Sequence, residues 1–309
     1  MSDKEGSTGS VKGFLVLSRL PFLSPGIAAF VTGIFVAVGD GFDPDLGLVG
    51  MSVTGLAMIM LTTYYFNEYY DFEGDVINRT FIKFSGGSRA IPDKMVSRKV
   101  AKAAGFASIA VLVIYAIVYL LVYFQDYPLL LPLGLFGAFC GVFYSHPPFQ
   151  WAYQGIGEIM IGGCYGVLSL ASGYYVSSGV LEPAAVLIAI PASLTVFSVI
   201  VANEFPDYVA DKAVNKRNLI VRLGPGRGQY VFIAAMALTY PFMVASIAVG
   251  VSPLIAVVGL PVLLCCAIAI KETLGGGYAR QDSQIRISGA TLFANVLSSL
   301  LFVPVVLIW

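Results

Sequence analysis

Residues 183–211 read PAAVLIAIPASLTVFSVIVANEFPDYVAD, and this stretch decides the fold. No charged side chain occurs over residues 183–203, and this run is long enough for an α-helix to cross a hydrocarbon core of roughly 30 Å. Charged residues begin at Glu204 and recur at Asp207 and Asp211. The stretch therefore predicts a transmembrane helix that ends at an acidic boundary.

The rest of the chain repeats this apolar pattern. Hydrophobic residues make up 58% of the 309 residues and charged residues 12%, about half of the roughly 25% charged residues of soluble domains. Such a composition cannot cover a soluble protein of this length with a polar surface. The chain is therefore predicted to be a single all-α, membrane-embedded domain over residues 1–309. Nine apolar spans are expected, at 13–38, 47–66, 103–125, 128–144, 154–177, 183–203, 229–250, 252–270 and 287–308.

The positive charges are confined to alternate connections. All 18 Lys and Arg residues lie in the N-terminal segment up to Arg19 or in the connections after spans two, six and eight. The positive-inside rule then places the N-terminus in the cytoplasm and Trp309 on the far side of a multi-pass cell-membrane protein. The 18 Asp and Glu residues bring the net charge to zero, so nothing favours a nucleic-acid partner. No obligate protein partner is inferred.

An internal repeat ends the second and sixth spans. Residues 67–75 read NEYYDFEGD and residues 203–211 read NEFPDYVAD. Such a repeat indicates two related halves, about 13–144 and 154–270, followed by the ninth span at 287–308. Four spans separate the two copies, so both are expected on the same side of the membrane, which the charge count makes the cytoplasmic side.

Each copy of the repeat carries oxygen-bearing side chains at positions i, i+4 and i+8, which advance about 40° per step and form one helical stripe. Pro206 threatens the second stripe, because proline removes a backbone N–H. Four carboxylates facing one cavity would repel each other, and oxygen-only ligands select hard cations such as Mg²⁺. The predicted magnesium ligands are Asn67, Asp71, Asp75, Asn203, Asp207 and Asp211, of which the four aspartates are the predicted catalytic residues.

Basic side chains flank both stripes. The candidates for binding a diphosphate are Arg19, Arg79, Lys83, Arg89, Lys212 and Lys216. Cations of this kind bind phosphate oxygens well. The alternatives are topology-setting charge near anionic lipid for Arg79, Lys83 and Arg89, and snorkelling to the interface for Arg19. For Lys212 and Lys216 the alternative is that they balance the neighbouring carboxylates. With apolar spans behind the head group, the pattern describes a polyprenyl diphosphate such as geranylgeranyl diphosphate. The long connection 67–102 is predicted to close as a lid that excludes water.

With these motifs the chain resembles the UbiA superfamily of intramembrane prenyltransferases, which has nine transmembrane helices and two Asp-rich motifs. Segments 19–21 (RLP), 144–149 (YSHPPF) and 155–158 (GIGE) are also similar to that family. The resemblance implies that Mg²⁺ on the Asp motifs promotes departure of diphosphate, and that a nucleophilic acceptor captures the allylic cation. Tyr144, His146 and Glu158 are candidates for the acceptor or prenyl pocket. The alternative is a loop position for His146 and a helix N-terminal charge for Glu158.

The acceptor is inferred from the resemblance alone. Segments 85–89 (SGGSR), 203–207 (NEFPD) and 215–219 (NKRNL) look like the menaquinone-type members, which use 1,4-dihydroxy-2-naphthoate. Such an aromatic quinone precursor is the expected acceptor. The first alternative is transfer of geranylgeranyl to geranylgeranylglyceryl phosphate in archaeal ether-lipid synthesis. The alternative of another class is a cation transporter, although transporter carboxylates normally lie near the bilayer midplane.

Overall fold

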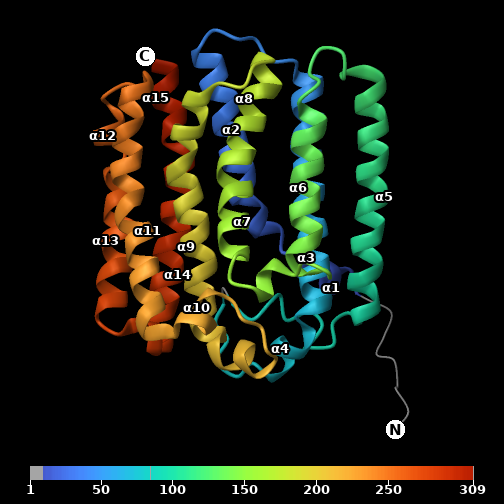
Figure 1. Cartoon of the computed structure of the whole chain (residues 1–309), viewed down its shortest axis with the longest axis vertical. Helices are drawn as coiled ribbons and strands as arrows, with labels where there is room; N and C mark the ends of the chain where they lie inside the picture. Colours follow the sequence, from blue (N-terminus) through green and yellow to red (C-terminus); the bar gives the residue numbers. More distant parts are fainter. Residues whose placement is uncertain (1–9, 84, 309) are drawn as a thin grey trace.

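The structure is a computed structural model that describes residues 10–83 and 85–308. All regular elements within these ranges are helices, which confirms the predicted all-α fold. Figure 1 shows most of the helices side by side along the long axis of the molecule, as in a membrane-spanning bundle.

Most crossings of the bundle are single long helices: α3 (Leu46–Tyr70), α5 (Arg98–Val122), α9 (Pro183–Ala213), α11 (Pro225–Ala245), α13 (Leu260–Leu274) and α14 (Gln281–Leu300). Other crossings join consecutive pieces: α1 (Val11–Leu17) with α2 (Ser24–Gly39), α7 (Gly157–Gly163) with α8 (Ser169–Ser178), and α14 with α15 (Phe302–Ile308). The remaining α-helices are α4 (Phe72–Ile77), α6 (Leu130–Ser145), α10 (Leu219–Leu223) and α12 (Ile255–Val258).

Eight segments of the described residues are long and apolar enough to cross a membrane. They are Val11–Gly39, Leu46–Tyr70, Arg98–Val122, Gly157–Ser178, Pro183–Ala213, Pro225–Val249, Ile255–Leu274 and Gln281–Ile308. The remaining predicted span, 128–144, coincides with α6, whose 16 residues extend about 24 Å at the helical rise. Because this is shorter than a hydrocarbon core of roughly 30 Å, the count of nine spans stays a prediction.

The first predicted span is interrupted in its interior. Between α1 and α2 the backbone of Arg19 adopts a left-handed conformation with φ 47°, and Pro21 follows in a short 3₁₀ turn, Leu20–Leu23. A left-handed conformation is uncommon for a residue other than glycine. The interruption turns the Arg19 side chain towards the interior of the bundle.

The helix is interrupted in the first copy of the repeat and not, as Pro206 suggested, in the second. α9 continues through Pro206 to Ala213, so the second stripe persists. The break falls in the first copy instead, where Asp71 separates α3 from α4. Backbone bonds still join Asp71 N to Asn67 O (2.8 Å) and Asp75 N to Asp71 O (3.0 Å). The first stripe therefore keeps its helical register across the break.

The connections that carry the basic residues lie at one end of the bundle. Figure 1 places α1, α4, α10 and the turn between α13 and α14 at this end. The grouping agrees with the charge segregation along the sequence, and the cytoplasmic assignment of this end stays a prediction. The topology prediction also used Lys4 and Trp309, which lie outside the described residues.

The largest buried apolar cluster holds α9 in place. It joins α9 to α2, α8, α11, α13 and α14, with Phe232, Met236 and Phe302 fully buried. α3 lies on the other side of the bundle centre and packs against α5 and α6. α2 and α8 contact both α3 and α9, so the two helices that carry the acidic repeat are held within one bundle.

Candidate active site

A polar cavity lies at the α4–α10 end of the bundle. All six predicted metal ligands line it: Asn67, Asp71, Asp75, Asn203, Asp207 and Asp211. Arg19, Tyr144 and Lys216 line the same cavity. The structure thus brings together residues that are far apart in the sequence, in a space that we call the carboxylate cavity.

Lys216 joins the two copies of the repeat. Its Nζ lies 2.7 Å from Asp71 Oδ2 and 3.7 Å from Asp211 Oδ1. Burial opposes protonation of this amine, but the carboxylates of Asp211 and Asp71 outweigh burial and raise the pKa of Lys216 well above its usual value. Lys216 is therefore an ammonium ion placed between two carboxylates of the cavity.

The other contacts of Asp71 and Asp211 are neutral donors. The hydroxyl of Tyr153 donates to Asp71 Oδ1 at 2.8 Å, and Asn67 Nδ2 donates to Asp71 Oδ2 at 2.8 Å. Asn218 Nδ2 donates to Asp211 Oδ2 at 2.8 Å. Burial, with Asp71 beside it, raises the pKa of Tyr153 far above its usual value, so this phenol remains a hydrogen-bond donor.

Asp207 is held by the connection that follows the first copy. Asn78 Nδ2 donates to its Oδ1 at 2.7 Å, and the backbone N–H of Gly86 donates to its Oδ2 at 3.1 Å. Gly86 and Gly87 both have positive φ, at 74° and 71°, which glycine adopts without strain. The predicted lid segment therefore already lies over the cavity and is tied to the second acidic motif.

Glu68 and Arg19 form a second polar group at the cavity edge. Arg19 Nη1 lies 3.7 Å from Glu68 Oε1, and the guanidinium lies 4.6 Å from the ring of Phe22. Both Glu68 oxygens also accept from Ser88, from the backbone N–H at 2.6 Å and from the hydroxyl at 2.7 Å. The Nε of Arg19 is buried without a protein partner, so this side chain keeps an unused donor in the site.

Asp75 is linked to Arg89 through the backbone rather than through its carboxyl group. Arg89 Nη1 donates to Asp75 O at 2.5 Å, and the guanidinium lies 4.3 Å from the ring of Phe81. Burial raises the pKa of Asp75 well above its usual value, and the carboxylates of Asp71 and Glu68 raise it further. Without a cation, this carboxyl group retains its proton to a higher pH than a free aspartate.

Several predicted site residues lie outside the cavity lining. Arg79 and Lys83 are exposed, and Lys212 is exposed with its Nζ 5.7 Å from the Tyr208 ring. His146 packs edge-on against Phe66 and Tyr70. The structure therefore separates Arg19 and Lys216, which line the cavity, from these more distant cations and from the histidine.

Glu158 is buried behind the cavity wall. Its Oε1 accepts from the backbone N–H of Leu219 at 2.8 Å, while Glu204, which lines the cavity, accepts from the next N–H, that of Ile220, at 3.2 Å. The two glutamates thereby fix the start of α10. Glu158 also lies in the first turn of its own helix, α7, so its position corresponds to the structural alternative, a charge at a helix N-terminus.

The sequence motifs did not single out Tyr153, Asn78 or Ser145 as site residues. Ser145 Oγ accepts from Asn67 Nδ2 at 3.1 Å, and the other two donate to the aspartates. Tyr153 and Asn78 lie in connections that carry no motif signal, whereas Ser145 ends α6 inside segment 144–149, where only its neighbours Tyr144 and His146 were chosen as candidates. These residues could be identified only from the three-dimensional path of the connections over the helix ends, which the sequence motifs do not specify.

The residues of the cavity suit a hard divalent cation chemically. Carboxylate and amide oxygens are the ligands of Mg²⁺, and both motifs present them to one space. Within residues 10–83 and 85–308 no three acidic, cysteine or histidine side chains yet converge on one point. The ammonium of Lys216 already lies between the carboxylates of Asp71 and Asp211, so a divalent cation that binds both would compete with this lysine.

Fold and site define a helical membrane protein with paired carboxylate motifs at one end of a buried cavity. Residues 26–297 match the profile described as the UbiA prenyltransferase family, and the chain belongs to this family. This finding confirms the resemblance drawn from the repeat and its flanking segments.

Curated relatives carry names of naphthoate-type enzymes. A 1,4-dihydroxy-2-naphthoate octaprenyltransferase of Bacillus subtilis is 26% identical over 205 residues, which cover 66% of this chain and 64% of the relative. A 2-carboxy-1,4-naphthoquinone phytyltransferase of Synechocystis is 31% identical over 38% of each chain. The match thus covers less than two thirds of the length of either relative.

Solved structures share the fold. A UbiA homologue from Aeropyrum pernix superposes with a TM-score of 0.66 at 16% identity, covering 90% of this chain and 97% of that chain. A UbiA homologue from Archaeoglobus fulgidus, determined with GPP and Mg²⁺ bound, has a TM-score of 0.58 at 16% identity, covering 95% and 100%.

Proposed function

We propose that this chain is a Mg²⁺-dependent intramembrane prenyltransferase. It transfers a polyprenyl group from a polyprenyl diphosphate to an aromatic quinone precursor of the 1,4-dihydroxy-2-naphthoate type and releases diphosphate. The observation that carries the proposal is the convergence of both acidic motifs with Arg19 and Lys216 on one cavity that has an apolar interior behind it. Family membership and the names of the curated relatives support the reaction class and the acceptor.

The four aspartates and the two asparagines would hold Mg²⁺, which when bound neutralises the charge of the diphosphate. Arg19 and Lys216 then provide cationic donors beside it. The unused Nε of Arg19 is available to a phosphate oxygen, and Lys216 can turn from Asp71 towards the ligand as the carboxylates acquire another partner. Fixed cations of this kind stabilise the charge that develops on the leaving diphosphate.

Bond cleavage leaves the electron pair on diphosphate and an allylic cation on the prenyl group. Tyr144 and Tyr64 line the cavity, and aromatic faces attract a cation by about 0.5–2 kcal/mol. The acceptor supplies the electron pair for the new bond, and its ring is restored when the attacked carbon loses its proton, or its carboxyl group as carbon dioxide. The segment 78–89, held by Asp207 and Glu68, covers the cavity and excludes the water that would otherwise capture the cation.

The protein would work as a multi-pass membrane protein whose site faces the cytoplasm. This orientation follows from the positive-inside rule together with the position of α4 and α10 at the same end as the basic connections (Figure 1). The same face would receive a water-soluble aromatic acid and release diphosphate. An aromatic acceptor reaching this end needs no passage across the bilayer.

An acceptor panel tests the proposal. The purified protein in lipid nanodiscs is supplied with labelled geranylgeranyl or octaprenyl diphosphate, Mg²⁺, and either 1,4-dihydroxy-2-naphthoate or geranylgeranylglyceryl phosphate. Prenylated naphthoate is the expected product. Product from the glycerol phosphate alone would replace the acceptor assignment with ether-lipid synthesis. Passage of Mg²⁺ across sealed vesicles without any product would favour a cation transporter.

A further inference from the structure

The interruption between α1 and α2 is held on both sides by hydroxyl groups of α3. The Tyr65 hydroxyl lies 2.9 Å from Ser18 Oγ. The Tyr64 hydroxyl donates to the backbone carbonyl of Phe22 at 2.6 Å. Ser18 and Phe22 flank Arg19, whose backbone is left-handed with φ 47°. The chain before and after Arg19 is therefore tied to one helix.

The direction of the first bond follows from the other partner of Ser18. The Ser18 hydroxyl already donates to Phe14 O at 2.8 Å, and a serine hydroxyl has a single hydrogen to donate. Tyr65 is therefore the donor to Ser18 Oγ. Ser18 and Tyr65 are 3% and 5% exposed, so water has little access to replace this donor if the Tyr65 hydroxyl is removed.

Glu68 belongs to the same face of α3. It follows Tyr64 by four residues and Tyr65 by three, which are the spacings at which side chains lie next to each other on a helix. Its Oε1 lies 3.7 Å from Arg19 Nη1. The helix therefore contacts the guanidinium of Arg19 as well as the backbone on both sides of it.

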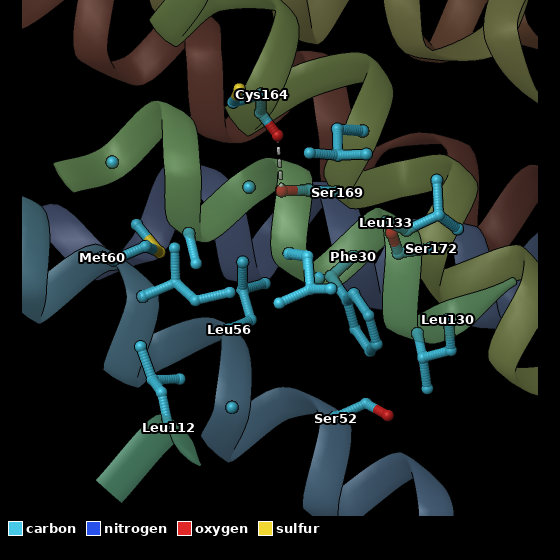
Figure 2. A pocket seen from close by; sticks show the side chains of 18 of the residues that line it. Phe30, Ser52, Leu56, Met60, Leu112, Leu130, Leu133, Cys164, Ser169 and Ser172 are labelled. Atoms are coloured by element: carbon cyan, nitrogen blue, oxygen red, sulfur yellow. Dashed lines mark hydrogen bonds between the residues drawn. The ribbon is translucent and has the colours of Figure 1, made fainter. Parts of the chain in front are cut away.

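This polar face lies between two different environments of α3. Nearer the start of the helix, Leu56 and Met60 turn apolar side chains to an apolar cavity that is also lined from α5, α6 and the α7–α8 segment (Figure 2). At the other end, Asn67 and Asp71 line the carboxylate cavity. One helix thus fixes the place of Arg19 relative to the first acidic motif.

The left-handed conformation of Arg19 costs free energy because its Cβ is crowded there, so the turn needs support from its surroundings. Building on the proposed function, in which Arg19 binds the diphosphate, we propose that Tyr65 and Tyr64 are positioning residues. Their hydroxyl groups hold the turn and thereby aim the buried, unpartnered Nε of Arg19 at the donor. Tyr65 lies outside the lining of the carboxylate cavity, so its effect on the donor must pass through Arg19.

The test is a double-mutant cycle between Tyr65 and Arg19. Tyr65→Phe, Arg19→Met and the double variant, each as the full-length protein in nanodiscs, are titrated with geranyl thiolodiphosphate, a non-hydrolysable donor analogue, in the presence of Mg²⁺. Tyr65→Phe should lower the affinity about three- to tenfold when Arg19 is present. The same change should lower it by less than about twofold when Arg19 has been replaced by methionine.

The matched control is Thr62→Val, also on α3. Thr62 Oγ1 donates to Ser108 Oγ on α5 at 2.8 Å, so this variant loses a buried hydrogen bond between helices away from the interruption. Thr62→Val and Tyr65→Phe should lower the Tm by similar amounts, but Thr62→Val should keep the affinity within about twofold of the wild type. Tyr64→Phe should repeat the effect of Tyr65→Phe, because it keeps the ring and removes only the hydroxyl that holds Phe22 O.

The outcomes separate the positioning role from the proposed reaction. An equal loss of affinity from Tyr65→Phe with and without Arg19 would overturn the positioning role, and so would an equal loss in Thr62→Val, which would assign the effect to the general stability of α3. Coupling between Tyr65 and Arg19 in a protein that forms no prenylated naphthoate would retain the positioning role and reject the acceptor assignment. A wild-type protein that binds no geranyl thiolodiphosphate would overturn both proposals.

Discussion

Replacing Lys216 by methionine removes the ammonium ion that joins the two acidic motifs and keeps the length of the side chain. The Lys216 and Asp71 side chains are 17% and 10% exposed, and their charged atoms lie 2.7 Å apart. Removing one partner of a buried ion pair costs about 3–5 kcal/mol. Because both side chains retain some solvent, we expect the lower value, about 3 kcal/mol. At about 2–4 °C per kcal/mol, the Tm of the metal-free protein should fall by roughly 6–12 °C.

Mg²⁺ should affect this variant and the wild type differently. In Lys216→Met the carboxylates of Asp71 and Asp211 have lost a competing cation, so Mg²⁺ should restore more of the Tm in the variant than it adds to the wild type. The Mg²⁺ concentration at half effect should fall, because electrostatic repulsion between the ammonium and the metal is gone. Affinity for a prenyl thiolodiphosphate should decrease instead, since one phosphate donor is missing. A higher affinity for Mg²⁺ together with a lower affinity for the diphosphate ligand would indicate that a cation lies between the two motifs.

The assay is thermal unfolding of the protein in nanodiscs, followed across a Mg²⁺ titration. Lys212→Met is the matched control, because this lysine is four residues earlier, exposed, and only approaches the ring of Tyr208 at 5.7 Å. Its Tm should change by an amount that corresponds to about 0.5 kcal/mol or less. Equal decreases for both variants, or a Lys216→Met protein whose Tm does not respond to Mg²⁺ more than the wild type, would refute the assigned role of Lys216.

Three further changes probe the site and the bundle. Asp207→Asn should abolish Mg²⁺-dependent release of diphosphate, while the free energy of unfolding falls by no more than about 3 kcal/mol, since the single amide oxygen can still accept from one of the two donors, Asn78 Nδ2 or Gly86 N; full turnover would contradict its catalytic assignment. Mg²⁺ affinity should rise with increasing pH, because the raised pKa of Asp75 means that the metal must displace a proton from a carboxyl group. Isothermal titration at several pH values, in buffers of different ionisation enthalpy, should show this proton release, and a pH-independent affinity would count against it. Gly33→Ala should lower the free energy of unfolding by about 3 kcal/mol or more, and with it the Tm, because an added Cβ would lie 2.0 Å from Leu170 O between α2 and α8. The control is Gly289→Ala on α14, where an added Cβ meets no atom within 4 Å. This variant should leave the Tm nearly unchanged.

The acidic motifs could be predicted from the sequence because a helical stripe depends only on local spacing. The positions i, i+4 and i+8 face one side whether or not the rest of the fold is known. The same argument fails for the cations that follow. Lys212 and Lys216 look equivalent in the sequence, yet one is exposed and the other lies between two aspartates. What separates them is the end of α9.

The chain reverses immediately after α9 because Asn215 adopts a left-handed conformation with φ 58°, a conformation that asparagine tolerates better than most residues. The backbone N–H of Lys216 then donates to Asp211 O at 2.8 Å, and the side chain points back along the helix that has just ended. Lys212 still belongs to α9 and follows its outer face. Arg19 itself adopts a left-handed conformation between α1 and α2. Both cations of the cavity are therefore placed by backbone turns that cannot be read from the spacing of residues.

The charge balance of the carboxylate cavity constrains the order of events in the proposed reaction. Five acidic side chains line it, namely Asp71, Asp75, Glu204, Asp207 and Asp211, against the two cations Arg19 and Lys216. Arg19 is further committed to Glu68. A diphosphate approaching this cavity alone would meet a surplus of negative charge in a region of low dielectric constant, where repulsion is poorly screened. The divalent cations must therefore bind before the diphosphate donor or together with it. Until they bind, the ammonium of Lys216 offsets the repulsion between the carboxylates of the two motifs.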